Sequence, residues 1–457
     1  MKIFGSSGVR GVANEELTPA FVGRVAMAAG SVYAADADSR PRVALGRDTR
    51  ITGEMFADSA AAGLASVGCD VDRIGVVPTP ALQAYAEREG IPGLIITASH
   101  NPPEYNGVKL VGSDGVELAR DALERVEDRL LADRFTFADW ETTGESHRID
   151  TVQEEYVTEL LNRVHRGDIE AADVRIALDP GHGAGSLTSP GFFRELGCDV
   201  VTVNAQPDGR FPGRDPEPVE ENLADLRRLV RTADADLGVA HDGDADRAIF
   251  VDETGAHVEG DAALAALAAA ELEAGDTTVS AVNVSQRLVD VVDEAGATLE
   301  LTSIGSTNII TRIQRLRREG ATVPVAGEGN GGVLFPNYRL ARDGAYTAAR
   351  FIELLAATKR TASEIAADHG GYHNIRRNVG YSDDDERERL LAAAEEAARG
   401  SDADLTTIDG YRLDYGDGWV LVRPSGTEPV VRLYAEARDR DRAEKLADAM
   451  ETDLREV

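Results

Sequence analysis

The stretch Arg42-Val43-Ala44-Leu45-Gly46-Arg47-Asp48-Thr49-Arg50 begins with a short apolar run and ends in a charged loop. A helix-forming segment over 54–66 follows it, and Gly68-Cys69-Asp70-Val71 then opens a second apolar run. Two apolar runs joined by a helix of about ten or more residues are typical of a βαβ unit, which places helices against a parallel sheet. This stretch therefore predicts an α/β fold.

The same order of strand, loop and helix occurs twice more along the chain. We expect a strand over 174–178 with a helix over 190–196, and a strand over 278–282 with a helix over 286–295. Three copies of one supersecondary unit indicate three related mixed α/β domains.

The C-terminal part follows a different pattern. From about residue 372 we expect a strand, a helix over 385–399, and then strands over 411–415, 418–423 and 430–437. This order predicts a smaller α+β domain. The expected domain bounds are 1–150, 151–254, 255–368 and 369–457.

Acidic residues dominate the charge of the chain. Its 457 residues include 81 Asp and Glu but only 48 Lys and Arg, which gives a formal net charge of -33. The acidic residues are dispersed rather than gathered in a tail, as on a surface adapted to high salt, where counter-ions screen self-repulsion. The alternative, an acidic tail for a basic partner, would need blocks of like charge. Such a surface would repel phosphate backbones, so we expect neither nucleic acid nor a membrane as a partner.

Two cysteines, Cys69 and Cys198, are too few for a disulfide framework, and we expect both to be buried and inert. The N-terminus lacks the apolar core of a signal peptide, and no run of 18 apolar residues is present. We therefore expect a soluble, cytoplasmic protein.

Ser99 follows an apolar strand over 94–97 and precedes a Pro-Pro pair that holds the chain extended. A serine at a rigid strand end suits a nucleophile or phosphoacceptor. His100 can stabilise charge or move a proton, and Lys109, one of only four lysines, suits a catalytic role beside a phosphoserine. On this segment alone, the alternative is that Ser99 caps a turn and Lys109 is a surface charge.

Asp242, Asp244 and Asp246 alternate, so in an extended chain they would share one face. Three converging carboxylates favour a hard cation such as Mg²⁺, Ca²⁺ or Mn²⁺. An EF-hand is excluded because its sixth position would be Arg247 instead of glycine, and apolar strands flank the loop. Arg247 can hold a phosphate beside the metal. The alternative is a solvated acidic turn.

Two further loops carry ligand-binding residue types. Arg423-Pro424-Ser425-Gly426-Thr427 combines an arginine, two hydroxyls and a glycine turn, which predicts a phosphate cradle. The glycine-rich loop over 327–332 carries Glu328 and Asn330, which suit sugar hydroxyls better than phosphate. The segment 181–185 lacks the glycine spacing of a dinucleotide loop.

Together these segments resemble the α-D-phosphohexomutase family, which includes phosphoglucomutases, phosphomannomutases and phosphoglucosamine mutases. The resemblance spans the whole chain in the order of the family. The matching segments are 4–11, 46–50, 97–109, 242–247, 327–332 and 423–429. Asn330-Gly331-Gly332 is similar to archaeal members, where bacterial members usually have Ser-Gly-His.

The resemblance implies a fold of four domains around a central cleft and a role for each matching residue. Ser99 would be phosphorylated and would bind one Mg²⁺ together with Asp242, Asp244 and Asp246. Glu328 and Asn330 would bind the sugar, and Arg423, Ser425, Gly426 and Thr427 would hold the substrate phosphate. Arg10, His100, Lys109 and Arg247 would line the catalytic centre.

The implied reaction interconverts hexose 6-phosphate and hexose 1-phosphate through a bisphosphorylated sugar, which would also act as activator. Phosphoglucosamine mutase is the expected activity, with a phosphomannomutase or phosphoglucomutase of broad specificity as the alternative. A phosphoserine-dependent phosphatase would not need the Arg423 loop, and a sugar-phosphate sensor would not need Ser99. Whether the protein is a monomer or a dimer stays open.

Overall fold

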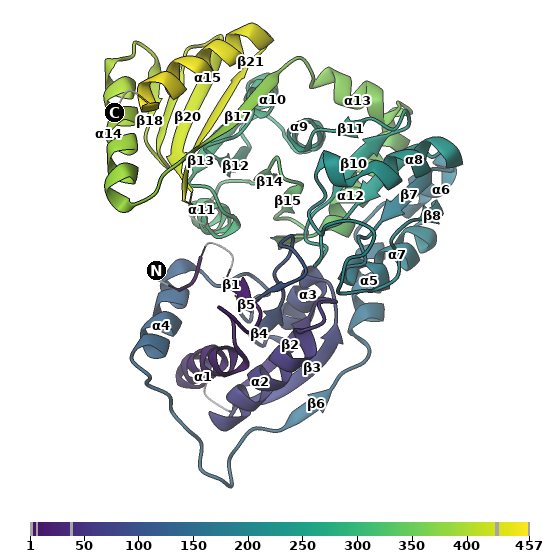
Figure 1. The fold of residues 1–457 in the computed structure, drawn as a ribbon. Helices are drawn as coiled ribbons and strands as arrows, with labels where there is room; N and C mark the ends of the chain where they lie inside the picture. The colour runs from purple at the N-terminus through teal and green to yellow at the C-terminus, as the bar shows by residue number, and fades with distance from the viewer. Residues whose placement is uncertain (1–2, 6–7, 37–39, 426–428, 456–457) are drawn as a thin grey trace. The chain divides into compact units, whose positions relative to one another are not determined.

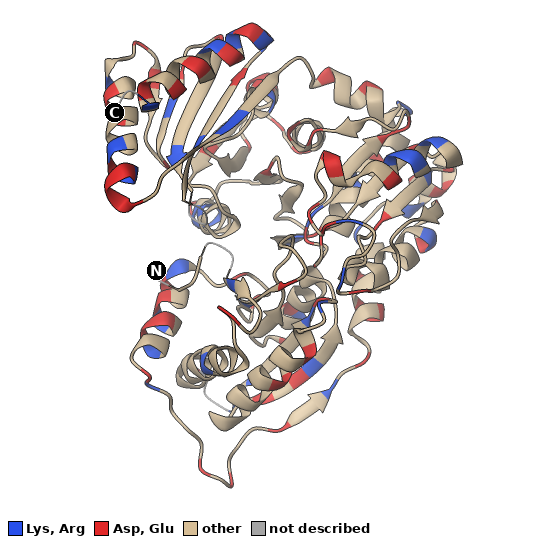
Figure 2. Cartoon of the chain, in the orientation of Figure 1, with Lys and Arg blue, Asp and Glu red and all other residues tan. Residues whose placement is uncertain are grey.

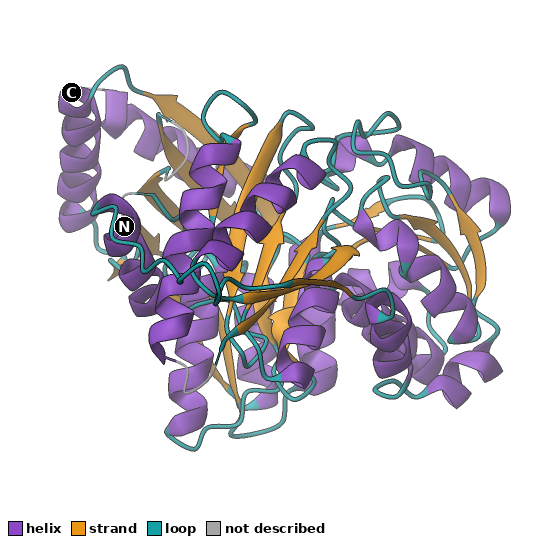
Figure 3. Ribbon diagram, turned by 90° about the horizontal axis from the view of Figure 1, so that it is seen from below, coloured by secondary structure: helices purple, strands orange, loops and turns teal. Residues whose placement is uncertain are grey.

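The computed structural model of the protein describes residues 3–5, 8–36, 40–425 and 429–455. The chain forms two compact units (Figure 1). The first comprises Met1–Ala263 and Asn330–Ile365, and the second comprises Leu264–Gly329 and Ala366–Val457. Helices cover the strands, as Figure 3 shows.

The first unit begins with a six-stranded sheet in the order β1-β5-β4-β2-β3-β6. Strand β2 is parallel to β3 and β4, whereas β5 is antiparallel to both β4 and β1. Its apolar core lies between this sheet and helices α1, α2 and α4. The elements are β1 (Val9–Val12), α1 (Pro19–Asp36), β2 (Arg42–Arg47), α2 (Gly53–Ser66), β3 (Asp70–Val76), α3 (Thr79–Glu89), β4 (Gly93–Ile96), β5 (Tyr105–Val111), α4 (Arg120–Leu131) and β6 (Ser146–Arg148).

A five-stranded sheet in the order β11-β10-β9-β7-β8 follows in the same unit. Strand β9 is parallel to β7 but antiparallel to β10. The elements are α5 (Val152–Leu161), α6 (Arg166–Ala172), β7 (Arg175–Asp179), η1 (Ala184–Leu187), α7 (Ser189–Glu195), β8 (Asp199–Thr202), η2 (Glu220–Asn222), α8 (Ala224–Ala233), β9 (Leu237–Ala240), β10 (Ile249–Asp252) and β11 (His257–Val258). The unit also contains the antiparallel pair β15 (Gly332–Phe335) and β16 (Arg339–Arg342), followed by α12 (Gly344–Thr358).

The second unit combines parallel strands with a separate antiparallel sheet. Strand β12 is parallel to β13 and β14, and the last sheet has the antiparallel order β17-β21-β20-β19-β18. The elements are β12 (Thr277–Ala281), α10 (Gln286–Ala295), β13 (Thr298–Thr302), α11 (Ser306–Arg318), β14 (Ala326–Glu328), β17 (His373–Gly380), α14 (Asp384–Gly400), β18 (Asp404–Thr406), β19 (Tyr411–Asp414), β20 (Gly418–Pro424), β21 (Val430–Ala437) and α15 (Arg440–Arg455). Helices α9 (Gly260–Glu271) and α13 (Ala362–Asp368) contain residues of both units.

Buried polar side chains attach the last sheet to the β12–α10 segment within the second unit. Arg412 donates hydrogen bonds to the carbonyls of Val282 at 2.6 Å and Val284 at 3.1 Å, and its guanidinium lies 4.1 Å from the ring centroid of Trp419. Glu436 accepts from the Trp419 indole at 3.1 Å. These interactions satisfy buried charges that would otherwise be costly.

Charged residues lie mainly on the outer helices, for example α4, α14 and α15, whereas most strand residues are uncharged (Figure 2). Among the described residues, no helix combines the length and apolar character that crossing a membrane requires.

Candidate active site

Three buried aspartates occupy the loop between β9 and β10. One carboxylate oxygen from each of Asp242, Asp244 and Asp246 lies within 4.8 Å of the others. The predicted hairpin is present, but the strands end at Ala240 and resume at Ile249. The carboxylates therefore do not converge by strand alternation, as the spacing suggested. They converge because the loop turns back, with Ala245 in the left-handed region at φ 55°.

The glycine-rich segment 181–185 supports this acidic loop. The Ala184 amide donates to the Gly243 carbonyl at 2.9 Å, and a Cβ on Gly183 would lie only 2.6 Å from the same oxygen. Arg214 donates to the His241 carbonyl at 2.6 Å. These glycines therefore allow close backbone packing beneath the acidic loop.

Ser99, in the loop after β4, and Lys109, on β5 of the same sheet, contact the aspartates directly. The Ser99 hydroxyl donates to Asp242 Oδ2 at 2.7 Å. The Lys109 ammonium donates to Asp244 Oδ2 at 2.7 Å and to Asp246 Oδ2 at 3.2 Å. The structure thus brings Ser99, the predicted nucleophile, and Lys109 to the acidic loop, which lies more than a hundred positions further along the chain.

Two residues of this cluster carried no signal in the sequence. Thr79, at the start of α3, donates its hydroxyl to Asp244 Oδ2 at 2.6 Å. Arg342, at the end of β16, donates to Asp246 Oδ2 at 2.6 Å. Threonine at a helix start and arginine in a strand are both common, so only tertiary packing identifies them.

Arg10, His100 and Arg247, which were predicted to line the catalytic centre, lie in or beside the loop over 97–104, here called the Ser99 loop. Arg247 donates from Nη2 to His100 Nδ1 at 3.0 Å, and this ring nitrogen also lies 3.3 Å from the Ser99 hydroxyl. Arg10, on β1, donates to the Asn101 side chain at 2.7 Å. The charge of Arg247, together with burial, lowers the pKa of His100 far below its usual value. His100 is therefore neutral, and its Nδ1 is a hydrogen-bond acceptor.

The pKa values of Asp242 and Asp244 shift in opposite directions. Burial, followed by the charges of Asp246 and Asp244, raises the pKa of Asp242 to about 8. Burial alone would raise the pKa of Asp244, but Lys109 and Thr79 hold it below the ordinary range. Burial would likewise lower the pKa of Lys109, but Asp244 and Asp246 raise it, so that Lys109 is an ammonium here.

The carboxylates retain oxygens that suit a hard cation. Asp244 Oδ1 and Asp246 Oδ1 are buried and have no hydrogen-bond partner among the described residues. Buried carboxylate oxygens normally have partners, and oxygen ligands of this kind favour Mg²⁺ or Ca²⁺. The residues present therefore fit a divalent cation.

The other predicted ligand-binding residues lie in separate segments. Glu328 ends β14 in the second unit and is largely buried. Asn330 belongs to the first unit, where its side chain accepts from the Gly332 amide at 3.0 Å. Arg423, on β20, forms an ion pair of 3.2 Å with Asp409, and Ser425 follows it. Gly426 and Thr427 lie outside the described residues.

The sequence matches four domain families in succession. They are described as phosphoglucomutase/phosphomannomutase alpha/beta/alpha domain I over residues 1–137, domain II over 154–255, domain III over 259–371 and the C-terminal domain over 378–452. The chain belongs to the phosphoglucomutase/phosphomannomutase family. The predicted family, and the predicted fold class of three α/β domains with a smaller α+β domain, are therefore confirmed.

Relatives within the phosphoglucomutase/phosphomannomutase family match over nearly their full length. A phosphoglucomutase/phosphomannomutase of Thermococcus kodakarensis is 42% identical, with 97% of this chain and 96% of the relative covered. A probable phosphoglucosamine mutase of Methanopyrus kandleri is 39% identical, with 98% and 96% covered. The crystal structure of a phosphoglucomutase/phosphomannomutase family protein from Burkholderia thailandensis has a TM-score of 0.85 at 28% identity, with 99% and 97% covered.

Proposed function

We propose that this protein is a Mg²⁺-dependent phosphohexomutase that interconverts hexose 6-phosphate and hexose 1-phosphate through a phosphoserine at position 99. The observation that carries the proposal is the 2.7 Å hydrogen bond from the Ser99 hydroxyl to Asp242, inside a cluster of three carboxylates. A phosphoryl group on Ser99 would lie beside this acidic loop, where only a cation can offset the repulsion.

Asp242, Asp244, Asp246 and phosphorylated Ser99 would hold one Mg²⁺ per chain. This cation would stabilise the negative charge that spreads over the transferring oxygens. Arg247 and Arg10 flank the Ser99 loop and add positive charge toward the same oxygens.

In the transfer step, a sugar hydroxyl oxygen forms a bond to phosphorus as the bond between phosphorus and Ser99 Oγ breaks. The hydroxyl proton must leave the attacking oxygen, and we assign Lys109 and His100 to assist. His100 Nδ1 lies 3.3 Å from Ser99 Oγ and accepts from Arg247, so it would take a proton only after Arg247 releases it. Lys109 would take this role only after its ammonium, which binds Asp244 and Asp246, had lost a proton.

A mutase must bind both ends of its substrate. We propose that Arg423, Ser425, Gly426 and Thr427 bind the phosphate that does not react, whereas Glu328 and Asn330 bind sugar hydroxyls. The sugar bisphosphate would turn around before it returns a phosphoryl group to Ser99, and free sugar bisphosphate would activate dephosphorylated enzyme.

The preferred substrate that we propose is glucosamine phosphate, as in the name of the Methanopyrus kandleri relative. The alternative is a broad phosphoglucomutase and phosphomannomutase activity, which the name of the Thermococcus kodakarensis relative favours. We also propose a cytoplasmic protein adapted to high salt, without nucleic-acid or membrane partners. Its state as a monomer or a dimer is open.

The test combines intact-mass analysis with coupled mutase assays on glucosamine, glucose and mannose phosphates. We expect one phosphoryl group on the wild type and none on Ser99→Ala, with at least about a thousandfold loss of kcat/KM in the variant. Full activity in Ser99→Ala would exclude the phosphoserine mechanism. Release of inorganic phosphate without isomerisation would instead favour a phosphatase.

A further inference from the structure

We propose that Arg50 is a positioning residue that locks the backbone of the Ser99 loop and thereby directs the Ser99 hydroxyl toward the acidic loop. The proposal deepens the function proposed above and rests on it for its kinetic consequence. Its structural basis is independent of the reaction.

The Arg50 guanidinium is fully enclosed, and its hydrogen bonds converge on one loop. Nη2 donates to the Ser99 carbonyl at 2.9 Å and to the Asn101 carbonyl at 2.6 Å. Nη1 donates to the Pro102 carbonyl at 2.5 Å and to the Tyr105 carbonyl at 2.9 Å. With the bond from Nε to Asp48 at 3.1 Å, all five N–H donors of the guanidinium are used. An ordinary surface ion pair would not engage four carbonyls of one loop.

These bonds matter because Ser99 has an unfavourable backbone conformation. Its φ is 54°, in the left-handed region that residues other than glycine rarely adopt. Such a conformation costs on the order of 1 kcal/mol or more and persists only where surrounding contacts enforce it. Here the Thr97 hydroxyl accepts from the Ser99 amide at 2.9 Å, and Arg50 binds the Ser99 carbonyl. The residue is therefore held on both sides.

Arg50 and Thr97, which bind the Ser99 backbone on its two sides, form a clamp, and Asp48 connects them. Its Oδ2 atom accepts from Arg50 Nε and, at 2.7 Å, from the Thr97 hydroxyl. Asp48 and Arg50 are both buried, so each satisfies a charge that would otherwise be costly. This arrangement gives a physical role to the charged residues that end the Arg42–Arg50 stretch.

The segment 209–214 packs against Arg50. The centroid of the Phe211 ring lies 5.2 Å from the Arg50 guanidinium. The backbone of Gly209 forms a parallel β-bridge with Arg50. A Cβ on Gly209 would lie 2.2 Å from the Thr49 carbonyl, so this approach requires glycine. Arg214, in the same segment, donates a hydrogen bond to the carbonyl of His241, the residue before Asp242. Arg50 thus lies between the two segments whose side chains meet at Ser99 and Asp242.

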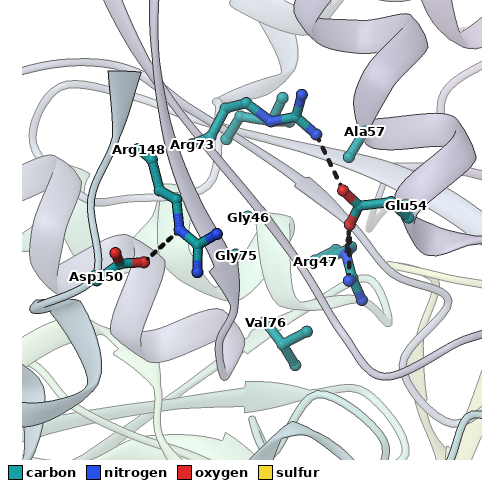
Figure 4. Close-up of a pocket in the computed structure, with 10 residues that line it drawn as sticks. Gly46, Arg47, Glu54, Ala57, Arg73, Gly75, Val76, Arg148 and Asp150 are labelled. Carbon is teal, nitrogen blue, oxygen red and sulfur yellow. Dashed lines mark hydrogen bonds and ion pairs between the residues drawn. The ribbon is translucent and has the colours of Figure 1, made fainter. Parts of the chain in front are cut away.

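Arg73 offers a matched control on the outside of the same domain. It lines a cavity of about 620 Å³, where it is paired with Glu54 at 3.3 Å (Figure 4). It also pairs with Asp58 at 2.5 Å. In contrast to Arg50, it contacts partly exposed carboxylates instead of loop carbonyls.

The test compares Arg50→Lys with Arg73→Lys, both of which keep the charge but lose the planar fork. For Arg50→Lys we expect kcat to fall at least about tenfold, with KM changed less than about threefold. We also expect faster amide hydrogen exchange in the peptide over 97–105. Arg73→Lys should match the wild type in both measurements. Wild-type kcat and exchange in folded Arg50→Lys would overturn the proposal.

Thr97→Val provides a second variant if Arg50→Lys does not fold. It keeps the side-chain shape but removes the hydroxyl that binds the Ser99 amide and Asp48, so the same local increase in exchange is expected. Unchanged exchange in Thr97→Val would then overturn the proposal. Because the exchange measurement needs no substrate, it judges the clamp even if the wild type has no mutase activity. A wild type without mutase activity would reject the proposed function but not the role of Arg50.

Discussion

The Ser99 hydroxyl lies 2.7 Å from Asp242 Oδ2, although 143 positions separate the two residues in the chain. The contact joins the loop that follows β4 to the loop between β9 and β10. It is the central geometric condition for a phosphoserine that shares a cation with three aspartates.

Removal of divalent cations should abolish activity without unfolding the protein. Lys109 and Arg342 already pair with Asp244 and Asp246, so the acidic loop is partly neutralised without metal. We expect treatment with EDTA to remove mutase activity and excess Mg²⁺ to restore it. Circular dichroism should show an unchanged secondary structure and a melting midpoint lowered by only a few degrees. Loss of secondary structure in EDTA would contradict this expectation.

Replacement of Lys109 by methionine should destabilise the metal-free protein strongly. The change leaves Asp244 and Asp246 buried without their ammonium partner, which should cost roughly 3–5 kcal/mol of unfolding free energy. Mg²⁺ should recover part of this loss, because it neutralises the same carboxylates. Urea unfolding with and without Mg²⁺ measures both effects. Lys445→Met, on the exposed side of α15, should stay within about 0.5 kcal/mol of the wild type.

The two cysteines should be unreactive in the native protein. At high pH they should lower its unfolding free energy. Burial raises the pKa of both Cys69 and Cys198 to about 12, above the ordinary value of 9.0. Between pH 9 and 12 the unfolded thiols lose protons that the native thiols keep. The unfolding free energy should therefore fall as pH rises, by at most about 1.4 kcal/mol per pH unit and thiol.

A thiol reagent such as DTNB should label neither cysteine at pH 8 until urea unfolds the chain. The double variant Cys69→Ala, Cys198→Ala should show a shallower alkaline loss of stability than the wild type. Rapid labelling of native protein would show that burial does not protect these thiols.

Arg412 should be essential for the attachment of the last sheet within the second unit. Arg412→Met removes the donors to two buried carbonyls, those of Val282 and Val284, and should lower the unfolding free energy by roughly 2–4 kcal/mol. Hydrogen exchange should increase at the start of α10. The control Arg399→Met affects an exposed arginine of α14 that pairs with Glu395 at (i, i+4), and it should change stability by less than about 0.5 kcal/mol. Equal effects of the two changes would argue against this role of Arg412.

Local signals predicted the bounds of some elements correctly. The helix predicted over 286–295 has these bounds in α10, because the Ser285 side chain accepts from the Arg287 amide and Gly296 ends the helix in the left-handed region. The strand predicted over 430–437 likewise coincides with β21. In such elements, adjacent residues determine where the element begins and ends.

The contacts around the aspartates could not be predicted in this way. Thr79 and Arg342 reach Asp244 and Asp246 across 165 and 96 positions, and neither residue type is unusual at its place in the chain. The convergence of the aspartates was expected, but its cause was not. It depends on the turn at Ala245 and on the glycine packing beneath the loop, which are set by tertiary structure.

The excess of carboxylates on the outer helices affects any count of bound ions (Figure 2). A polyanion attracts a diffuse cloud of divalent ions at low ionic strength, and these would add to the one that we propose for Asp242, Asp244 and Asp246. Calorimetric titrations in dilute buffer should therefore overstate the stoichiometry. Molar potassium chloride should remove the diffuse ions and leave the single tight site.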